Sequence, residues 1–208
     1  MSMTPSAVIA ISVLHRSVQS TLALNCTGWY STVHSSSKET SMSITSDDTV
    51  SRDLVDQIAF RNAMGAVATP VSVVTTHLDG PHGTTVSAFM SLSLEPPMVL
   101  VSLQESSNLL PPLRATGRFG LNVLAHDQSP IGAGFAKREG DRFAGVAWSD
   151  FDGVPRIHGA AAFTVCTVGE MIVAGDHIIV TGLVTHAENH HEPGLVYQHR
   201  AFGTFAPH

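Results

Sequence analysis

The sequence predicts a mainly β protein, an antiparallel barrel with a few short helices inserted between its strands. Short β-branched and apolar segments recur from about residue 69 to the end of the chain, and such segments favour strands. Clusters of Gly, Pro, Asp and His separate them, as turns require. These segments do not alternate regularly with helical ones, so we expect an antiparallel barrel rather than a parallel α/β sheet.

Length and charge narrow the class of protein. The chain has 208 residues, enough for one domain with a substantial core, and its formal net charge is -6. An acidic balance lacks the basic face that nucleic-acid binding needs, and no apolar run is long enough for a transmembrane helix. Cys26 and Cys166 lie in different contexts, which does not suggest a disulfide framework. We expect a cytoplasmic protein that binds neither nucleic acid nor membrane.

Residues 1–49 differ in composition from the rest of the chain. This segment is rich in Ser and Thr and has almost no helical or strand periodicity, so it buries too little apolar surface to offset the entropy of ordering. Its apolar run, residues 7–14, has no Lys or Arg before it and no clear cleavage site after it, which argues against a signal peptide. We interpret it as a disordered extension, or as a misassigned start with the natural one at Met42. The folded domain is expected over residues 50–208.

The first expected elements are a helix and a hairpin. Ser51 is positioned to cap a helix that continues to Gly65, with Leu54 and Val55 on its apolar face. Residues 69–77 are β-branched and predict a strand that a turn over residues 78–83 joins to the next one.

The segment from Gly83 to Leu103 predicts strands suited to a ligand. Its first half is rich in Thr and Ser, and the Glu95-Pro96-Pro97 break precedes a second apolar strand that starts at Met98. A strand led by Gly and dense in small hydroxyl residues lets a flat, polar-edged ligand approach the backbone. A half-buried strand with one face in solvent would have the same composition. Both interpretations remain open on the residues alone.

The second half of the chain alternates short helices and strands before ending in strands. We expect helices at about residues 109–116 and 129–138, and strands at 119–124, 160–168, 177–187 and 195–205, with a Gly-rich loop around Trp148.

Three further motifs are candidates for ligand binding, and each has a structural alternative. Residues 104–108, Gln-Glu-Ser-Ser-Asn, lie before a helix and offer hydroxyls to a phosphate, or merely cap that helix. The Gly175-Asp176-His177 turn places an imidazole at a strand end, where it can contact a nicotinamide or stabilise charge. The alternative is an ordinary turn that Asp176 fixes, with no role for the histidine. Residues 197–200, Tyr-Gln-His-Arg, combine an aromatic ring, an imidazole and a guanidinium that can stack on and pair with a dinucleotide. The alternative is a polar strand end.

Other patterns carry less weight. Gly132-Ala-Gly134 follows no strand and lacks a third Gly, so it does not indicate a dinucleotide-binding fingerprint. His186, His190 and His191 lack a clear closed ligand set, and no metal site is expected. Cys166 lies within an apolar strand and is expected to be buried and inert.

Taken together, the ordered motifs resemble the short-chain NAD(P)H:flavin reductases, the reductase components of two-component flavin monooxygenases. The resemblance covers about residue 53 to the end and rests on segments 60–65 (FRNAMG), 73–75 (VVT), 83–89 (GTTVSAF), 91–97 (SLSLEPP), 117–124 (GRFGLNVL), 135–137 (FAK), 175–177 (GDH) and the closing Tyr197 to Arg200. The first fifty residues match nothing in that family.

The resemblance implies an FMN-binding split barrel, usually a homodimer with the flavin near the subunit interface. It implies NAD(P)H-dependent reduction of FMN or FAD by hydride transfer to flavin N5, with reduced flavin passing to a separate monooxygenase. The implied flavin-binding residues are Gly83, Thr84, Thr85, Val86, Ser87, Phe89, Met90, Gln104, Glu105, Ser106, Ser107, Leu110, Ala136 and Lys137. His177 is the implied catalytic residue, and it would meet the nicotinamide nucleotide together with Tyr197, Gln198, His199 and Arg200.

Some residues depart from the family pattern. Pro70 stands where Gly is common, Gly194 interrupts the usual Pro-Leu, and Gln198-His199 replaces a commoner Arg-containing pair, which leaves NADH or NADPH as the donor open. A non-enzymatic flavin carrier and another split-barrel flavin oxidase are the alternatives. The Gly-Asp-His turn and residues 197–200 favour the reductase, because a carrier needs neither.

Overall fold

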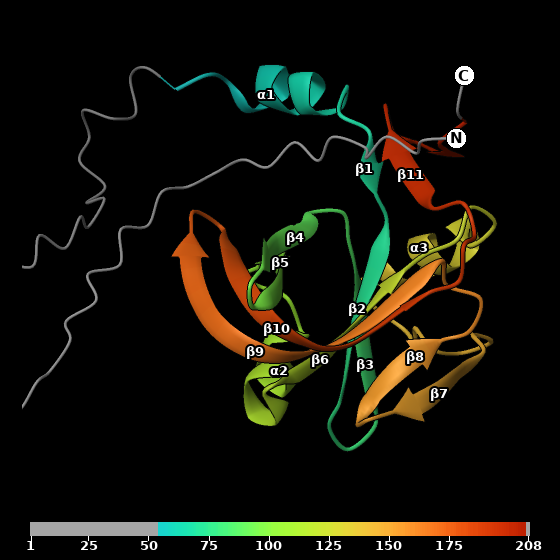
Figure 1. The fold of residues 1–208 in the computed structure, drawn as a ribbon. Coiled ribbons are helices and arrows are strands. Elements are labelled where there is room, and N and C mark those ends of the chain that lie inside the picture. The colour runs from blue at the N-terminus through green and yellow to red at the C-terminus, as the bar shows by residue number, and fades with distance from the viewer. Residues whose placement is uncertain (1–53, 207–208) are drawn as a thin grey trace, which may run out of the picture. The chain divides into compact units, whose positions relative to one another are not determined.

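The computed structural model describes residues 54–206, and this part of the chain consists mainly of antiparallel strands (Figure 1). The helices are α1 (Gln57–Met64), α2 (Leu110–Thr116) and α3 (Ser129–Phe135). The strands are β1 (Thr69–Pro70), β2 (Ser72–His77), β3 (Pro81–Val86), β4 (Phe89–Leu94), β5 (Pro97–Gln104), β6 (Arg118–Val123), β7 (Trp148–Phe151), β8 (Val154–Ile157), β9 (Ala162–Ala174), β10 (His177–Asn189), β11 (Leu195–Gln198) and β12 (Ala201–Thr204). The predictions for residues 1–49, for Met42 and for the Ser51 cap lie outside the described residues.

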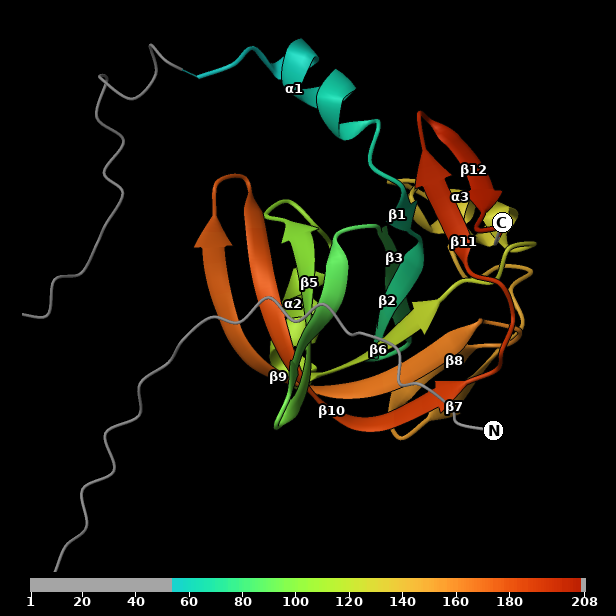
Figure 2. The ribbon, with the colours of Figure 1, turned by 45° about the horizontal axis from the view of Figure 1, so that its top comes forward.

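One curved sheet dominates the fold. Its strand order is β3-β2-β6-β9-β10-β5-β4, and every neighbouring pair is antiparallel. The amide N–H of Ser102 in β5 donates to the carbonyl of Ala88 at 2.9 Å, where the chain passes from β3 to β4. The smaller sheets are β1-β11-β12 and the β7–β8 hairpin (Figures 1 and 2). The prediction of a mainly β, antiparallel architecture with short helices is confirmed.

The core lies on the concave side of this sheet and under α2. The main cluster of buried side chains is Val74, Val86, Val101, Leu103, Leu109, Leu110, Leu113, Phe119, Leu121, Cys166, Ile178 and Val180. A second cluster, centred on Phe135 and Phe143, packs α3 and the following loop against β2. Removing these apolar side chains from water supplies the main driving force for folding.

Helix α1 begins later than the sequence predicts. Its N-cap is Asp56, whose carboxylate accepts hydrogen bonds from the amides of Ile58 (2.8 Å) and Ala59 (3.1 Å). Leu54 and Val55 precede the helix and are exposed, so the predicted apolar face that included them is wrong. An Asp side chain satisfies the free amides of a first helical turn as well as Ser does, so the helix starts after Asp56 rather than after Ser51.

The hairpins were predicted in part. The β2–β3 hairpin is confirmed, with Ser72 opposite Val86 and His77 opposite Pro81. The segment from 83 to 103 contains three strands rather than two, because Ser87 and Ala88 separate β3 from β4. The β7–β8 hairpin lies in the stretch that was expected to be a loop, and β9 continues six residues beyond the predicted end at Val168.

The last predicted strand is also a hairpin, β11–β12, whose turn contains His199 (φ 48°) and Arg200 (φ 65°). Positive φ at both central residues matches the twist of a two-residue hairpin. Non-Gly residues seldom adopt this conformation, so neither residue signals a turn in the sequence.

Of the two short helices between strands, α2 has the predicted end and α3 does not. Pro111 and Pro112 occupy the first turn of α2, where no amide is missed, and Gly117 ends that helix with φ 64°. Helix α3 ends at Phe135, so the next residues leave the helix three positions earlier than expected.

A buried polar network joins β2, β6 and β8. The Asn122 side-chain amide donates to the carbonyls of Val73 (3.2 Å) and Pro155 (3.3 Å), and its carbonyl accepts from the amide of Ile157 (2.8 Å). Thr75 donates to the Pro155 carbonyl at 2.6 Å. Each buried polar group thus has a partner, which is the condition for burying it without a large penalty.

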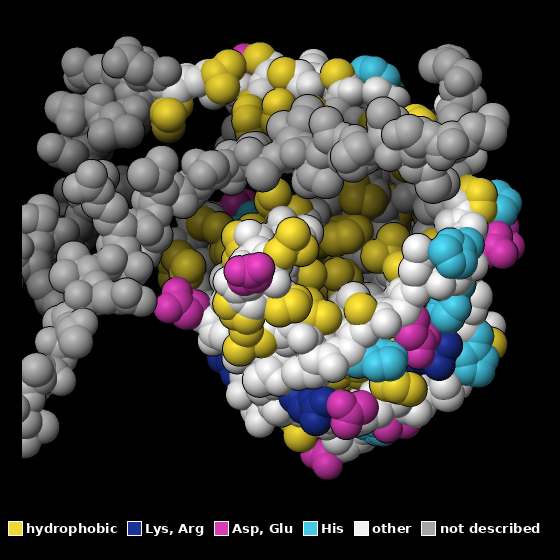
Figure 3. Space-filling model, viewed as in Figure 1, with side chains coloured by type: hydrophobic (Ala, Val, Ile, Leu, Met, Phe, Trp, Pro, Cys, Tyr) yellow, Lys and Arg dark blue, Asp and Glu magenta, His cyan; other side chains and the backbone are white. Residues whose placement is uncertain are grey.

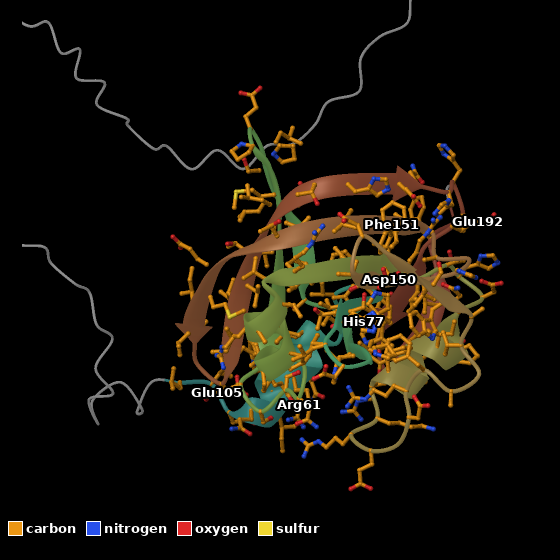
Figure 4. All side chains as sticks on the ribbon, turned by 90° about the horizontal axis from the view of Figure 1, so that it is seen from below. Arg61, His77, Glu105, Asp150, Phe151 and Glu192 are labelled. Carbon is orange, nitrogen blue, oxygen red and sulfur yellow. The ribbon has the colours of Figure 1, made fainter. Side chains whose placement is uncertain are left out.

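A contact at the surface connects the β7–β8 hairpin to β2. His77 Nδ1 and Asp150 Oδ2 are 2.9 Å apart, and both side chains are labelled in Figure 4. Within residues 54–206, no helix is both long and apolar enough to cross a membrane.

Candidate functional site

The candidate site is a cavity of about 520 Å³ at one end of β3 and β5. Cavities that hold small ligands are typically about 300–1,000 Å³. The lining residues are Thr84, Thr85, Val86, Ser87, Ala88, Ser102, Leu103, Gln104, Ser106, Ser107, Asn108, Ala136, Lys137, Arg138, Arg142 and His177. Four separate segments of the chain therefore meet here: β3 with its exit, the end of β5 with the turn before α2, the segment after α3, and the start of β10.

The β3 wall offers backbone and small polar side chains. The hydroxyl of Thr85 donates to the carbonyl of Gly132 in α3 at 2.6 Å, so its proton is already used. Ser87 is exposed and follows the last residue of the strand. Of these two hydroxyls, that of Ser87 is therefore the freer donor.

Gly83 has a role in packing the core. A Cβ there would lie 2.7 Å from the Phe135 ring and 3.3 Å from the Thr75 methyl, so protein side chains fill the space beside it. Its carbonyl accepts a hydrogen bond from Arg142 Nη1 at 2.7 Å. The absence of a side chain at Gly83 therefore makes room for the Phe135 ring, and the predicted flavin contact of Gly83 stays a prediction.

The turn between β5 and α2 contributes hydroxyls at the rim. Ser106 is exposed, and the Ser107 hydroxyl accepts from the amide of Leu109 at 3.3 Å. The N-cap of α2 is Leu109, which makes no side-chain capping bond. Neither Ser107 nor Asn108 is the cap residue, so the alternative that these residues merely cap the helix is not what the structure shows.

Three cationic side chains border the cavity on the segment after α3. They are Lys137, Arg138 and Arg142. No acidic residue between 54 and 206 forms an ion pair with any of them. Since Arg142 is fixed by a neutral carbonyl, this end of the cavity carries positive charge available to an anion.

His177 lies at the rim and is held by its neighbour. Its Nδ1 is 2.7 Å from Asp176 Oδ1. This hydrogen bond is the main reason that the pKa of Asp176 lies below its ordinary value, and the charge attraction to His177 acts in the same direction. A carboxylate only accepts hydrogen bonds, so Nδ1 carries a proton and Nε2 is the imidazole nitrogen left for a ligand.

The cavity brings together ten of the predicted site residues and leaves others outside. Thr84, Thr85, Val86, Ser87, Gln104, Ser106, Ser107, Ala136, Lys137 and His177 line it. Leu110 is buried in the main core, and Phe89 packs against that core. Met90 and Glu105 are exposed but do not line the cavity. The flavin contacts predicted for the residues outside the cavity stay predictions.

Residues 197–200 lie away from the cavity in this chain. Tyr197 packs on Phe202 with ring centroids 5.1 Å apart, and Gln198 Nε2 donates to the carbonyl of Ala66 at 2.7 Å. The amide of His199 donates to Gly65 at 2.8 Å. These contacts anchor the β11–β12 turn to the segment after α1 (Figure 2). Residues 197–200 do not line the cavity, and their predicted contact with a nicotinamide nucleotide stays a prediction.

Asn108, which belongs to the candidate motif 104–108, also lines the cavity, and five further lining residues were not singled out as site residues: Ala88, Ser102, Leu103, Arg138 and Arg142. Arg138 had a detectable signal, because it directly follows Lys137 after a helix, whereas Arg142 follows Glu139 and Asp141 and had none. Ser102 and Leu103 had none, because only the pairing of β5 with β10 brings them near His177.

The other histidine cluster has a structural explanation. His186 and His190 Nε2 atoms lie 3.0 and 3.3 Å from opposite oxygens of Glu188, and Arg156 approaches the same carboxylate at 2.7 Å. No group of three potential ligands among residues 54–206 has a geometry suited to a metal ion. Cys166 is buried as predicted, and burial raises the pKa of its thiol to about 11.

Residues 64–206 match the model of the flavin reductase like domain. A "Probable flavin reductase" of Rhizobium meliloti is 40% identical over 73% of this chain, which spans only 50% of that protein. The FMN reductase (NADH) SmoA of Agrobacterium fabrum is 41% identical, and the match covers 71% of this chain and 86% of that protein. The NADH:FAD oxidoreductase SgcE6 of Streptomyces globisporus, solved with NAD and FAD fragments, matches with a TM-score of 0.71 at 32% identity. That match covers 74% of this chain and 98% of the SgcE6 chain. The predicted split-barrel architecture is thereby confirmed.

Proposed function

The chain belongs to the flavin reductase-like family, and from this premise we propose that it reduces FMN or FAD with NADH or NADPH. The reduced flavin would then leave for a separate monooxygenase. The observation that supports this most directly is a hydroxyl-lined cavity with three available cations and a positioned imidazole. A flavin mononucleotide has the matching parts, a flat polar-edged ring, a polyhydroxylated chain and a phosphate dianion.

The residues present fit such a ligand. Backbone of β3 and the Ser87 hydroxyl border one side, where they can accept and donate along the edge of a planar ring. Ser106, Ser107 and Lys137 also line the cavity, and two hydroxyls and an ammonium suit a phosphate. Lys137 is exposed, so its attraction for the phosphate is partly screened by solvent.

The chemistry of the bound molecules is the transfer of a hydride from nicotinamide C4 to flavin N5. The protein's contribution is mainly to hold the two rings in register, because a correctly oriented pair reacts as if at very high concentration. His177, with Nδ1 fixed by Asp176, is proposed to contact the nicotinamide carboxamide through Nε2. It acts by positioning and by stabilising charge, and no proton at N5 is assigned to it.

We propose a homodimer on the strength of an exposed apolar edge. Strand β4 ends the seven-stranded sheet, and Met90 (54% exposed), Leu92 (44%) and Leu94 (78%) lie along it. Figure 3 shows hydrophobic side chains gathered around this strand. An apolar, unpaired edge favours association. In such a dimer the β11–β12 turn of the second copy is the candidate to bring Tyr197 to Arg200 to the nicotinamide.

The experiment that tests the function is anaerobic mixing of the protein with FMN or FAD and NADH. Bleaching of the flavin absorbance at catalytic protein concentration is expected, and intact flavin absorbance with either nucleotide donor would refute the assignment. A carrier would bind flavin tightly without oxidising NADH, and an amine oxidase of the same fold would release peroxide with an amine substrate. A cytoplasmic location is proposed with the reductase role and is tested by fractionating cells.

A further inference from the structure

The loop after α3, residues 136–142, carries the cations of the candidate site. Ala136, Lys137, Arg138 and Arg142 all line the cavity. Every residue from 136 to 141 is exposed, so packing of these side chains contributes little to fixing the loop. The position of its cations therefore depends on the few contacts that attach the loop to the rest of the fold.

The base of the loop is closed by two buried phenylalanines. Phe135 precedes the loop and Phe143 follows it, and their rings pack edge to face with centroids 4.8 Å apart. The Phe135 ring also occupies the space beside Gly83, where a Cβ would lie 2.7 Å from it. A loop whose ends are joined in this way is attached to the core at its base.

Arg142 attaches the loop to the backbone of β3. Its Nη1 donates to the carbonyl of Gly83 at 2.7 Å, and the residue is half-buried. The next two residues of β3, Thr84 and Thr85, line the cavity on the other side. The same hydrogen bond therefore sets how the loop and the β3 wall lie relative to one another.

The hydrogen bond of Arg142 limits the movement of the loop. A loop that is fixed only at its base can tilt about Phe135 and Phe143, and its exposed side chains do little to prevent this. Tilting away from β3 would carry Lys137 away from the cavity. The contribution of the Lys137 ammonium to binding an anion then falls, because the ammonium must be ordered again when the anion binds.

We infer that Arg142 is a positioning residue, which holds the loop against β3 and thereby places the ammonium of Lys137 at the cavity. The inference rests on the proposed function in one respect, since that function identifies the anion as the phosphate of FMN. In the competing explanation, Arg142 binds the phosphate directly through its remaining N–H groups.

The test compares Arg142→Ala with Arg142→Lys, and repeats Arg142→Ala in a protein that already carries Lys137→Ala. A lysine at this position keeps a donor on a long side chain for the Gly83 carbonyl. Arg114→Ala is the matched control, because Arg114 is exposed and does not line the cavity. Fluorescence titration measures the affinities for FMN and for riboflavin, which lacks the phosphate.

Arg142→Ala should weaken FMN binding about three- to fivefold and change riboflavin binding less than about twofold. Arg142→Lys should lose less than Arg142→Ala, and Arg114→Ala should match the parent. Combined with Lys137→Ala, the Arg142→Ala substitution should weaken FMN binding by less than about a further twofold, because the ammonium that it positions is gone.

Three results would overturn the inference. A loss that adds fully to that of Lys137→Ala would mean that Arg142 binds the phosphate itself. An equal loss for FMN and riboflavin would mean that Arg142 supports the fold in general. Unchanged FMN affinity in Arg142→Ala would mean that its hydrogen bond does not place the loop.

Hydrogen exchange in the ligand-free protein tests the loop directly. The amides of Lys137 and Phe143 donate hydrogen bonds of 3.2 and 2.9 Å to residues of α3 and of the loop. In Arg142→Ala both should exchange about threefold faster or more, while the amide of Ile157, in the buried network around β8, should exchange at the parent's rate. Parent-like exchange at Lys137 and Phe143 would overturn the inference.

The proposed function can fail independently of this inference. If neither flavin binds to the parent, the reductase assignment is wrong, and the exchange rates still decide whether Arg142 holds the loop. If flavin binds and is reduced while exchange in Arg142→Ala matches the parent, the positioning role is wrong and the reductase stands.

Discussion

Two groups of polar residues on the same sheet differ in how their hydrogen bonds are used. Around Asn122, between β2, β6 and β8, the side-chain amide and the Thr75 hydroxyl are buried and bonded to protein carbonyls. Around the cavity, Ser87 and Ser106 are exposed, and Lys137 forms no ion pair with any residue of 54–206. A small hydroxyl side chain therefore serves structure at Thr75 in β2 and remains available to a ligand at Ser87 and Ser106, which follow the ends of β3 and β5.

The difference follows from what lies opposite each group. The β7–β8 hairpin covers the Asn122 side, so the carbonyl of Pro155 reaches Thr75 and Asn122. The ends of β3 and β5 instead border the cavity, which the segment after α3 lines with cations. Composition cannot distinguish the two cases, because the covering element is distant in sequence.

The largest expected effect concerns the covered group. Asn122→Ala should reduce the free energy of unfolding by about 2–3 kcal/mol, because the Ile157 amide and two carbonyls lose a buried partner. Urea denaturation followed by circular dichroism measures this. Thr84→Ala, at the cavity, is the control and should change it by less than about 0.5 kcal/mol. Equal losses in the two variants would remove the distinction between the groups.

The next effect concerns the cationic end of the cavity. Lys137→Ala should weaken FMN binding about three- to tenfold, since an exposed ammonium–phosphate contact contributes about 1 kcal/mol. Riboflavin lacks the phosphate, so its affinity should change less than about twofold. Fluorescence titration with both flavins gives the ratio, and Arg114→Ala is the control. An equal loss for FMN and riboflavin would place the phosphate elsewhere.

A smaller effect is expected at the rim. His177→Ala should raise KM for NADH about threefold or somewhat more, as loss of one hydrogen bond implies, and leave the dissociation constant of flavin within about twofold. Steady-state kinetics and flavin titration measure the two quantities. Unchanged NADH kinetics would contradict the role given to this histidine. His126→Ala, on an exposed residue outside the cavity, is the matched control.

The smallest expected effect tests a half-covered polar group. The hydrogen bond from His186 is the main reason that the pKa of Glu188 lies below its usual value, and Arg156 acts in the same direction. A lowered folded-state pKa contributes stability above the ordinary carboxyl pKa, and this contribution disappears as the pH falls through the lowered value. Glu188→Gln should therefore lose less stability than the parent between neutral pH and about pH 3. An identical decline in urea midpoint would show that the carboxylate does not contribute.

The sequence predicted those parts of the fold that local chemistry determines. The β2–β3 hairpin follows from β-branched residues flanking a Gly-Pro turn, and the end of α2 follows from Gly117. The β11–β12 turn could not be predicted, because His199 and Arg200 adopt positive φ without the residues that normally favour it.

The candidate site was predicted where its residues share a motif. Thr84 to Ser87, Ser106 and Lys137 line the cavity as expected from the family resemblance. The packing role of Gly83 could not be predicted, because the space left by its missing side chain is filled by Phe135, fifty-two positions away. Arg142 was missed as a lining residue because only the packing of the loop after α3 brings it to β3.

The link between β5 and β10 has a consequence for how substitutions combine. Gln104 pairs with His177, and the amide of Glu105 donates to the carbonyl of Asp176 at 3.0 Å. The turn that carries Ser106 and the turn that carries His177 are thus joined through the backbone and must shift together. In a double-mutant cycle, changes at Ser106 and His177 should show a coupling energy larger than that of Lys137 with His177, because only the first pair shares a common support.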